Sequence, residues 1–191
     1  MPHALNQPAR HLPGEAGVWV FILGDLLMFA ALFITFAYYR SNDVASFIES
    51  QHALNQRCGA LNTIFMLTSS WCVAIAVQVA RAGETRIARG WLMAGMTCGF
   101  CFVVVKIFEY QEKIAVGITL MSNDFFMYYY MLTGLHLMHV LLGLGVLIFL
   151  WRSLYAPVSH ASVRTLESGA SFWHMVDLLW IVLFALLYML R

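Results

Sequence analysis

Long apolar stretches alternate with short polar connectors along this chain of 191 residues. Each apolar stretch is long enough to cross a hydrocarbon core of about 30 Å as a helix. Because lipid cannot satisfy open backbone groups, we expect all of the stretches to be helical. The pattern predicts an all-α fold, a polytopic membrane protein in which residues 1–191 form a single bundle of five transmembrane helices. The expected helices cover residues 18–39, 61–80, 91–110, 125–151 and 172–190.

Composition supports the membrane class. Hydrophobic residues make up 61% of the chain and charged residues only 11%, whereas about a quarter of the residues of a soluble domain are charged. The net charge of +1 gives no reason to expect a nucleic-acid partner. The start of the chain lacks the basic segment and cleavage site of a signal peptide, so we expect the first stretch to remain as an anchor.

The distribution of Lys and Arg predicts the orientation. One side of the predicted bundle carries Arg10, Arg81, Arg86, Arg89, Arg152 and Arg164, and the other carries Arg40, Arg57, Lys113 and Arg191. Positive residues favour the cytoplasmic side, so we expect a cytoplasmic N-terminus and an outside C-terminus. Aromatic residues near the ends of the stretches, such as Trp173, Tyr129 and Tyr188, are expected at the membrane interfaces.

Ionisable residues interrupt four of the stretches. They are Asp25 and three pairs with a spacing of three, Lys106/Glu109, His136/His139 and His174/Asp177. A charged residue at the bilayer centre costs about 2.5–3.5 kcal/mol on insertion scales. We therefore expect these side chains to face protein, either within this chain or on a partner.

Each polar group has a structural and a functional interpretation. Lys106 and Glu109 share a helix face and can neutralise one another, or they can belong to a proton or lipid-headgroup site. His136 and His139 have a spacing that suits a metal, but a stable site needs further ligands. His139 lies about 18 Å inside its helix and His174 about 3 Å inside the next, which argues against a haem or metal between them. No metal site is expected.

Asp25 stands within an apolar stretch, where it can form a structural hydrogen bond to His139 or serve as a proton relay. Small residues predict close helix packing in two stretches. Gly17, Gly24 and Ala31 repeat every seven residues in the first, and Gly95 and Gly99 form a G-x-x-x-G pattern in the third. The alternative is that glycine is simply common in membrane helices.

Motifs in all five stretches, in order, resemble subunit III of the haem-copper oxidase superfamily. They are FILGDLLMFAALFITF (21–36), LNT (61–63), Glu109-Tyr110, TGLHLMHVLLG (133–143) and ESGASFWHMVDLLWIVLF (167–184). The chain resembles the last five helices of the seven-helix members. Asp25 stands at an acidic position, known for reaction with carbodiimides, where cytochrome c oxidases usually have Glu. The opening LPGEAGVWVFILGDLLMF (12–29) is most similar to the NorE-type protein associated with nitric oxide reductase.

The resemblance implies a non-catalytic accessory subunit in a bacterial inner membrane. It implies a role in assembly, stability or proton uptake of a respiratory complex, with nitric oxide reductase first and a cytochrome c or quinol oxidase as the alternative. Haem, with iron or copper, is expected in the catalytic partner and not in this chain, whereas bound phospholipid is possible. Because the first two family helices are missing, a closed lipid cleft is not expected. Rival hypotheses are a stand-alone proton-coupled carrier and a metalloprotein built on the histidine pairs.

Overall fold

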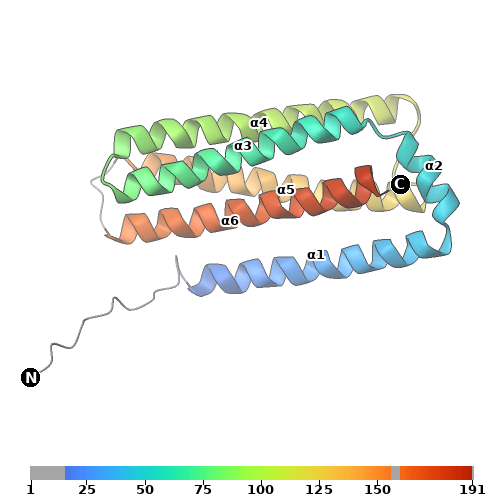
Figure 1. The fold of residues 1–191 in the computed structure, drawn as a ribbon, viewed down its shortest axis with the longest axis horizontal. Helices are drawn as coiled ribbons and strands as arrows, with labels where there is room; N and C mark the ends of the chain where they lie inside the picture. Colours follow the sequence, from blue (N-terminus) through green and yellow to red (C-terminus); the bar gives the residue numbers. More distant parts are fainter. Residues whose placement is uncertain (1–15, 156–159, 191) are drawn as a thin grey trace, which may run out of the picture.

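The structure is a computed structural model that describes residues 16–155 and 160–190. The described chain is helical throughout, apart from short connections (Figure 1). The elements are α1 (Ala16–Asn42), α2 (Val44–His52), α3 (Gln56–Arg81), α4 (Thr85–Ala115), α5 (Asp124–Ser153), α6 (His160–Phe184) and a π-helical turn η1 (Ala185–Met189). Within the described residues, five helices are long and apolar enough to cross a membrane. The prediction of an all-α protein with five spanning helices is therefore confirmed.

The spanning helices are longer than the apolar stretches that predicted them. For example, α4 covers Thr85–Ala115 rather than 91–110. Polar residues at the helix ends continue the backbone hydrogen bonding after the apolar run has stopped, so hydropathy underestimates length. Capping side chains fix some of the true ends: Asn55 accepts hydrogen bonds from the backbone at the start of α3, and Asn123 does so at the start of α5.

The connector at residues 40–60, between the first two expected helices, contains the short helix α2, which the pattern of apolar residues did not predict. Asp43 caps α2 by accepting a hydrogen bond from the backbone N–H of Ser46 at 3.2 Å. Phe47 is buried and packs edge-on against Phe36 of α1 and Phe125 of α5. A local cap and one aromatic anchor therefore give this connector a fixed structure.

Helices α3, α4, α5 and α6 form an antiparallel four-helix bundle, and α1 lies along one side of it against α5 and α6 (Figure 1). Ile22, Phe29 and Phe36, spaced seven apart, form the buried seam of α1. Only 17% of the most apolar part of α1 is buried, against 56% for α6. The expected five-helix bundle is therefore a compact bundle of four helices with a loosely attached fifth.

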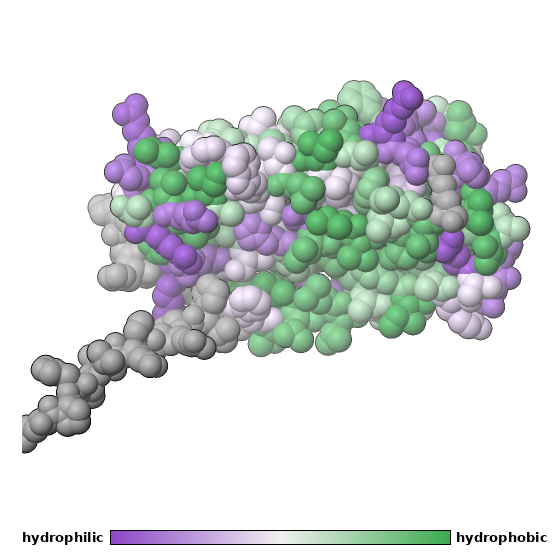
Figure 2. Space-filling view, viewed as in Figure 1, coloured by the Kyte–Doolittle hydropathy of each residue, from purple (hydrophilic) through white to green (hydrophobic). Residues whose placement is uncertain are grey.

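The two ends of the bundle differ. The end where α3 ends and α4 and α6 begin is called the Arg81 end, and the opposite end is called the α2 end. Hydrophilic side chains gather at both ends, and hydrophobic ones cover most of the middle (Figure 2). Arg10 and Arg191, used to predict the orientation, lie outside the described residues.

Several aromatic residues expected at the membrane interfaces lie inside the bundle instead. Trp173 and Tyr129 are fully buried, and Tyr188 is 1% exposed. Their polar atoms have partners within the protein: Trp173 Nε1, for example, donates to Ser69 Oγ at 3.2 Å. Because a partner is present, the large ring gains contacts without leaving an unsatisfied polar group. These three rings therefore pack within the bundle and do not face the lipid.

Candidate functional site: buried polar groups

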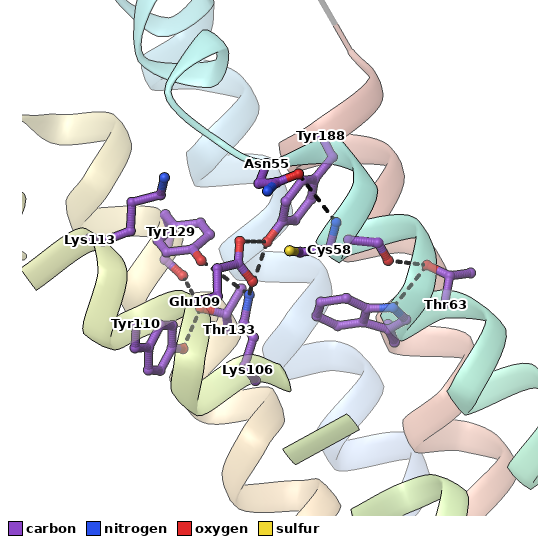
Figure 3. Close-up of polar contacts among 12 residues, drawn as sticks. Asn55, Cys58, Thr63, Lys106, Glu109, Tyr110, Lys113, Tyr129, Thr133 and Tyr188 are labelled. Carbon is purple, nitrogen blue, oxygen red and sulfur yellow. Dashed lines mark hydrogen bonds and ion pairs between the residues drawn. The ribbon is translucent and has the colours of Figure 1, made fainter. Parts of the chain in front are cut away.

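Lys106 lies at the centre of a buried polar cluster near the α2 end (Figure 3), and its side chain is 0% exposed. Its Nζ donates to Glu109 Oε2 at 2.9 Å, to Tyr129 OH at 3.1 Å and to Tyr188 OH at 3.0 Å. An ammonium group has three donors. All three are used, so the charged form of Lys106 is fully hydrogen-bonded within the protein.

Glu109 balances this charge. Its Oε2 accepts from Lys106 and its Oε1 accepts from Tyr188 OH at 2.6 Å. Tyr188 therefore accepts from the lysine and donates to the carboxylate. The side chains of Lys106 and Glu109 are both 0% exposed, which leaves no opening for a lipid headgroup. The geometry favours the structural interpretation of this pair, a neutral and closed network joining three helical segments.

Aromatic rings complete the surroundings of the ammonium. Lys106 Nζ lies 4.8 Å from the centroid of the Tyr129 ring and 5.2 Å from that of Trp180, within the range of a cation–π interaction. Spacing along the sequence did not identify Tyr129, Tyr188 and Trp180 as partners of Lys106. One signal was present: a buried lysine needs three acceptors, and Glu109 supplies only one.

Lys113 and Cys58 lie beside this cluster. Lys113 Nζ donates to the carbonyl oxygen of Ala53, which ties α4 to the end of α2. Cys58 lies in the first turn of α3, where its backbone N–H bonds Asn55 Oδ1 at 3.4 Å. The Cys58 side chain is half-buried and turns toward the cluster (Figure 3). Cys58 is thus a helical and partly buried residue.

Asp25 of α1 and His139 of α5 face each other across their helices, with Oδ2 and Nε2 3.4 Å apart. This distance is longer than an ordinary hydrogen bond. His139 Nδ1 lies 2.8 Å from the carbonyl oxygen of Leu135, and since a carbonyl only accepts, Nδ1 carries the proton. His139 Nε2 therefore faces Asp25 Oδ2 without an ordinary hydrogen bond between them. The pair connects α1 to the bundle.

His136 is fully buried, and neither of its ring nitrogens has a hydrogen-bond partner among the described residues. Its ring packs against those of Phe102, at a centroid distance of 5.6 Å, and Trp180, at 5.3 Å. No group of three or more His, Cys, Asp or Glu side chains in the described part of the chain could hold a metal ion.

His174 and Asp177 of α6 meet at Ser70 of α3. His174 Nδ1 lies 2.5 Å from Ser70 Oγ, and Ser70 also interacts with the carboxyl group of Asp177. The other oxygen of Asp177, Oδ1, has no partner. Sequence spacing indicated that His174 and Asp177 share a face of α6, but it did not identify Ser70, which lies on another helix.

The small residues expected to mediate packing fall into two groups. A Cβ at Gly95 would lie 3.1 Å from Val73, and one at Gly99 would lie 2.9 Å from Trp173, so both glycines are used inside the bundle. A Cβ at Gly17 or Gly24 would meet nothing within 4 Å, and Ala31 is exposed. The small-residue face of α1 is therefore open.

An apolar groove of about 480 Å³ lies between α1 and the α5–α6 pair at the Arg81 end. Val18 and Phe21 of α1 line one side, and Val146 of α5 and Phe172 of α6 line the other. The groove is open to the outside. Its shape and lining suit a hydrocarbon chain.

Comparison with known proteins shows which protein family the chain matches. The family model described as cytochrome c oxidase subunit III matches residues 13–191. The chain is 31% identical to the cytochrome c oxidase subunit 3 of a Synechocystis species over 199 residues, covering 95% of this chain and 83% of the relative. It is 29% identical to the corresponding protein of Corynebacterium diphtheriae, covering 98% of this chain and 92% of the relative.

A quinol oxidase subunit has a similar sequence identity to this chain. The cytochrome bo(3) ubiquinol oxidase subunit 3 of Pseudomonas putida is 29% identical, covering 91% of this chain and 84% of the relative. These matches support the resemblance to subunit III and favour the oxidase alternative of the sequence analysis. The finer similarity to the nitric oxide reductase type is not shown.

Proposed function

This chain belongs to the cytochrome c oxidase subunit III family, and from that membership we propose that it is the non-catalytic subunit III of a haem-copper terminal oxidase. The observation that carries the proposal is the extent of the match, which runs from residue 13 to residue 191 and so includes every spanning helix. Haem and copper would then belong to the catalytic subunit, and this chain would support its assembly, stability or proton uptake.

The face that contacts the catalytic subunit is proposed to be the small-residue face of α1. Gly95 and Gly99 are already packed against this chain's own side chains, so they are not free to receive a partner helix. Gly17 and Gly24 have open space around them, on the helix that buries least of its surface in the bundle. Small residues allow backbones to approach closely in lipid, and a partner helix would complete the packing of α1.

A phospholipid acyl chain is the proposed occupant of the groove between α1 and the α5–α6 pair. Gly17 and Phe21 line the groove from α1, and Gly17 also belongs to the proposed contact face. A lipid there would lie next to the partner and fill space that side chains of this chain leave empty.

The Arg81 end is proposed to face the cytoplasm, because Arg81, Arg86, Arg89, Arg152 and Arg164 gather there. Cysteines at Glu49 and Glu84 test this, since both positions are exposed, one in α2 and the other in the α3–α4 connection. In a chain carrying Cys58→Ser, an impermeant thiol reagent applied to intact cells is expected to label Glu49→Cys and not Glu84→Cys. The reverse pattern would invert the topology.

Co-purification tests the function itself. The tagged chain, solubilised from its own host in mild detergent, is expected to bring with it a haem-containing integral subunit that mass spectrometry identifies as the catalytic subunit of a terminal oxidase. From a host strain without that catalytic subunit, the same chain should purify free of haem and show no oxidase activity. Haem bound to the chain alone would overturn the accessory role, and a nitric oxide reductase subunit as the partner would overturn the oxidase assignment.

A further inference from the structure

A pocket of about 250 Å³, lined by polar and apolar residues, lies between α3 and α6 at the Arg81 end. At its mouth Arg81 Nε donates to Glu167 Oε1 at 2.8 Å, with side chains 53% and 15% exposed. Hydrophilic side chains cover this end of the two helices (Figure 2). His174 also lines the pocket, about 10 Å further along α6 than Glu167. The pocket thus runs from the exposed ion pair toward a histidine within the membrane-spanning part of α6.

One turn further along α6 than His174 lies the carboxyl group of Asp177, which lacks a hydrogen-bond partner for one of its oxygens. Asp177 is 5% exposed, and its Oδ1 has no hydrogen-bond partner. Ser70 links the two side chains, because its hydroxyl lies 2.5 Å from His174 Nδ1 and it also interacts with the Asp177 carboxyl group. Leaving a buried polar atom unpaired is costly, and in native proteins ordered water commonly supplies the missing bond. The polar side chains in the lining, His174 among them, and the unpaired oxygen of Asp177 one turn away are independent indications of water in this region.

We propose that this pocket is a water-filled inlet and that Asp177 is a proton-binding site that exchanges its proton with the water at the Arg81 end through Ser70 and His174. The ligand is a proton delivered by water. The inference goes beyond the role proposed above, because it concerns this chain alone and does not depend on which catalytic subunit is the partner.

The transfer conserves protons at every step. When Asp177 is protonated, its O–H donates to Ser70 Oγ, and the Ser70 hydroxyl donates to the bare Nδ1 of a neutral His174. Transfer along these two hydrogen bonds leaves Asp177 as a carboxylate, Ser70 again as a hydroxyl and His174 as an imidazolium. The imidazolium then releases the proton on Nε2 to water in the pocket. Uptake is the reverse sequence.

Few other charges face this relay. Arg81 of α3 and Glu167 of α6 are the charged residues among the described ones that line the pocket, and they form an ion pair with each other. Helices α1 and α5, which also pack on α6, contribute no residue to the lining. His174 is therefore the titratable group between the mouth and Asp177.

Access of water can be measured with cysteines on the full chain in proteoliposomes, after replacing the four native cysteines with alanine or serine. A small cationic methanethiosulfonate applied at the Arg81 end is expected to modify His174→Cys at least tenfold faster than Leu178→Cys. Leu178 lies one turn further along α6 and is 60% exposed on the lipid-facing surface. Ser171→Cys, also in the lining, serves if His174→Cys does not fold.

A pocket-filling variant provides the matched control. Ala74→Leu, in the lining, should slow modification at position 174, whereas Ala60→Leu, exposed at the other end of α3, should not. Equal rates at positions 174 and 178, or modification from the α2 end only, would overturn the inlet.

Proton binding is measured separately by infrared spectroscopy of the chain in nanodiscs. A carboxylic C=O band that disappears as the pH is raised and shifts in D₂O is expected in the parent protein and absent in Asp177→Asn. Ser70→Ala should keep the band but slow its deuterium exchange at least tenfold, because the bridge to His174 is lost. A parent spectrum with no titrating band that depends on Asp177 would overturn the proton site. Neither measurement uses a partner, so failure of co-purification would leave this inference standing.

Discussion

Replacing Lys106 with methionine is expected to lower the free energy of unfolding by about 3–5 kcal/mol, the range for breaking a buried ion pair by removing one partner. The substitution leaves the Glu109 carboxylate in a site that is 0% exposed, with Tyr188 OH as its remaining donor. The measurement is unfolding of the purified chain in mixed micelles with increasing SDS.

Removing both charges should cost less than removing one. Lys106→Met with Glu109→Leu takes away the unpaired carboxylate, so the double variant is expected to be at least as stable as either single one. It still leaves the hydroxyls of Tyr129 and Tyr188 without the partners they have in the parent protein. Adding Tyr129→Phe and Tyr188→Phe should therefore recover further stability. A double variant less stable than both singles would show that the two charges do not stabilise one another.

This cluster shows how far sequence spacing can predict a site. The i, i+3 spacing predicted that Lys106 and Glu109 share a face, and the structure places them in contact at 2.9 Å. Contacts within one helix follow from its fixed geometry. The contacts of Lys106 with Tyr129 and Tyr188 depend on how α5 and η1 are rotated and shifted against α4. The spacing of residues within one helix gives no information about these rotations and shifts. The same reason explains why Ser70 was missed beside His174.

The features of the fold that the lipid environment requires were predictable from the sequence. Apolar length fixed the number and type of spanning helices, because only helices satisfy the backbone in a bilayer. It did not predict α2, which depends on a local cap at Asp43 and on burial of Phe47. It also did not predict that α1 stands apart, because α1 is at least as apolar as the helices of the bundle.

Replacing Gly24 with leucine is expected to weaken association with the catalytic subunit at least tenfold, about 1.4 kcal/mol, without lowering the amount of the chain in the membrane. A Cβ at Gly24 would meet nothing within 4 Å in this chain, so the larger side chain fits the isolated subunit. It would, however, prevent the backbone of a partner helix from approaching α1 closely. Recovery of the catalytic subunit per tagged chain in mild detergent measures the effect.

Two matched variants separate this effect from misfolding. Gly99→Leu, unlike Gly24→Leu, is expected to disturb the packing of the chain itself. A Cβ at position 99 would lie 2.9 Å from Trp173 and 3.0 Å from Leu144. Overpacking of this kind typically costs about 1–3 kcal/mol, so the amount of chain should fall. Ala30→Leu adds the same bulk to an exposed position about 120° around α1 from Gly24, and it should change neither quantity.

Gly24 and Gly99 cannot be distinguished by their sequence pattern. Both are small residues at regular spacing in an apolar helix, and the structure separates them by their surroundings: Gly99 faces a tryptophan of its own chain, and Gly24 faces open space. If the partner binds at α1, only the open position should affect assembly. Unchanged association in Gly24→Leu together with weakened association in Ala30→Leu would move the contact to the other side of α1, and weakened association in neither variant would exclude α1 as the contact.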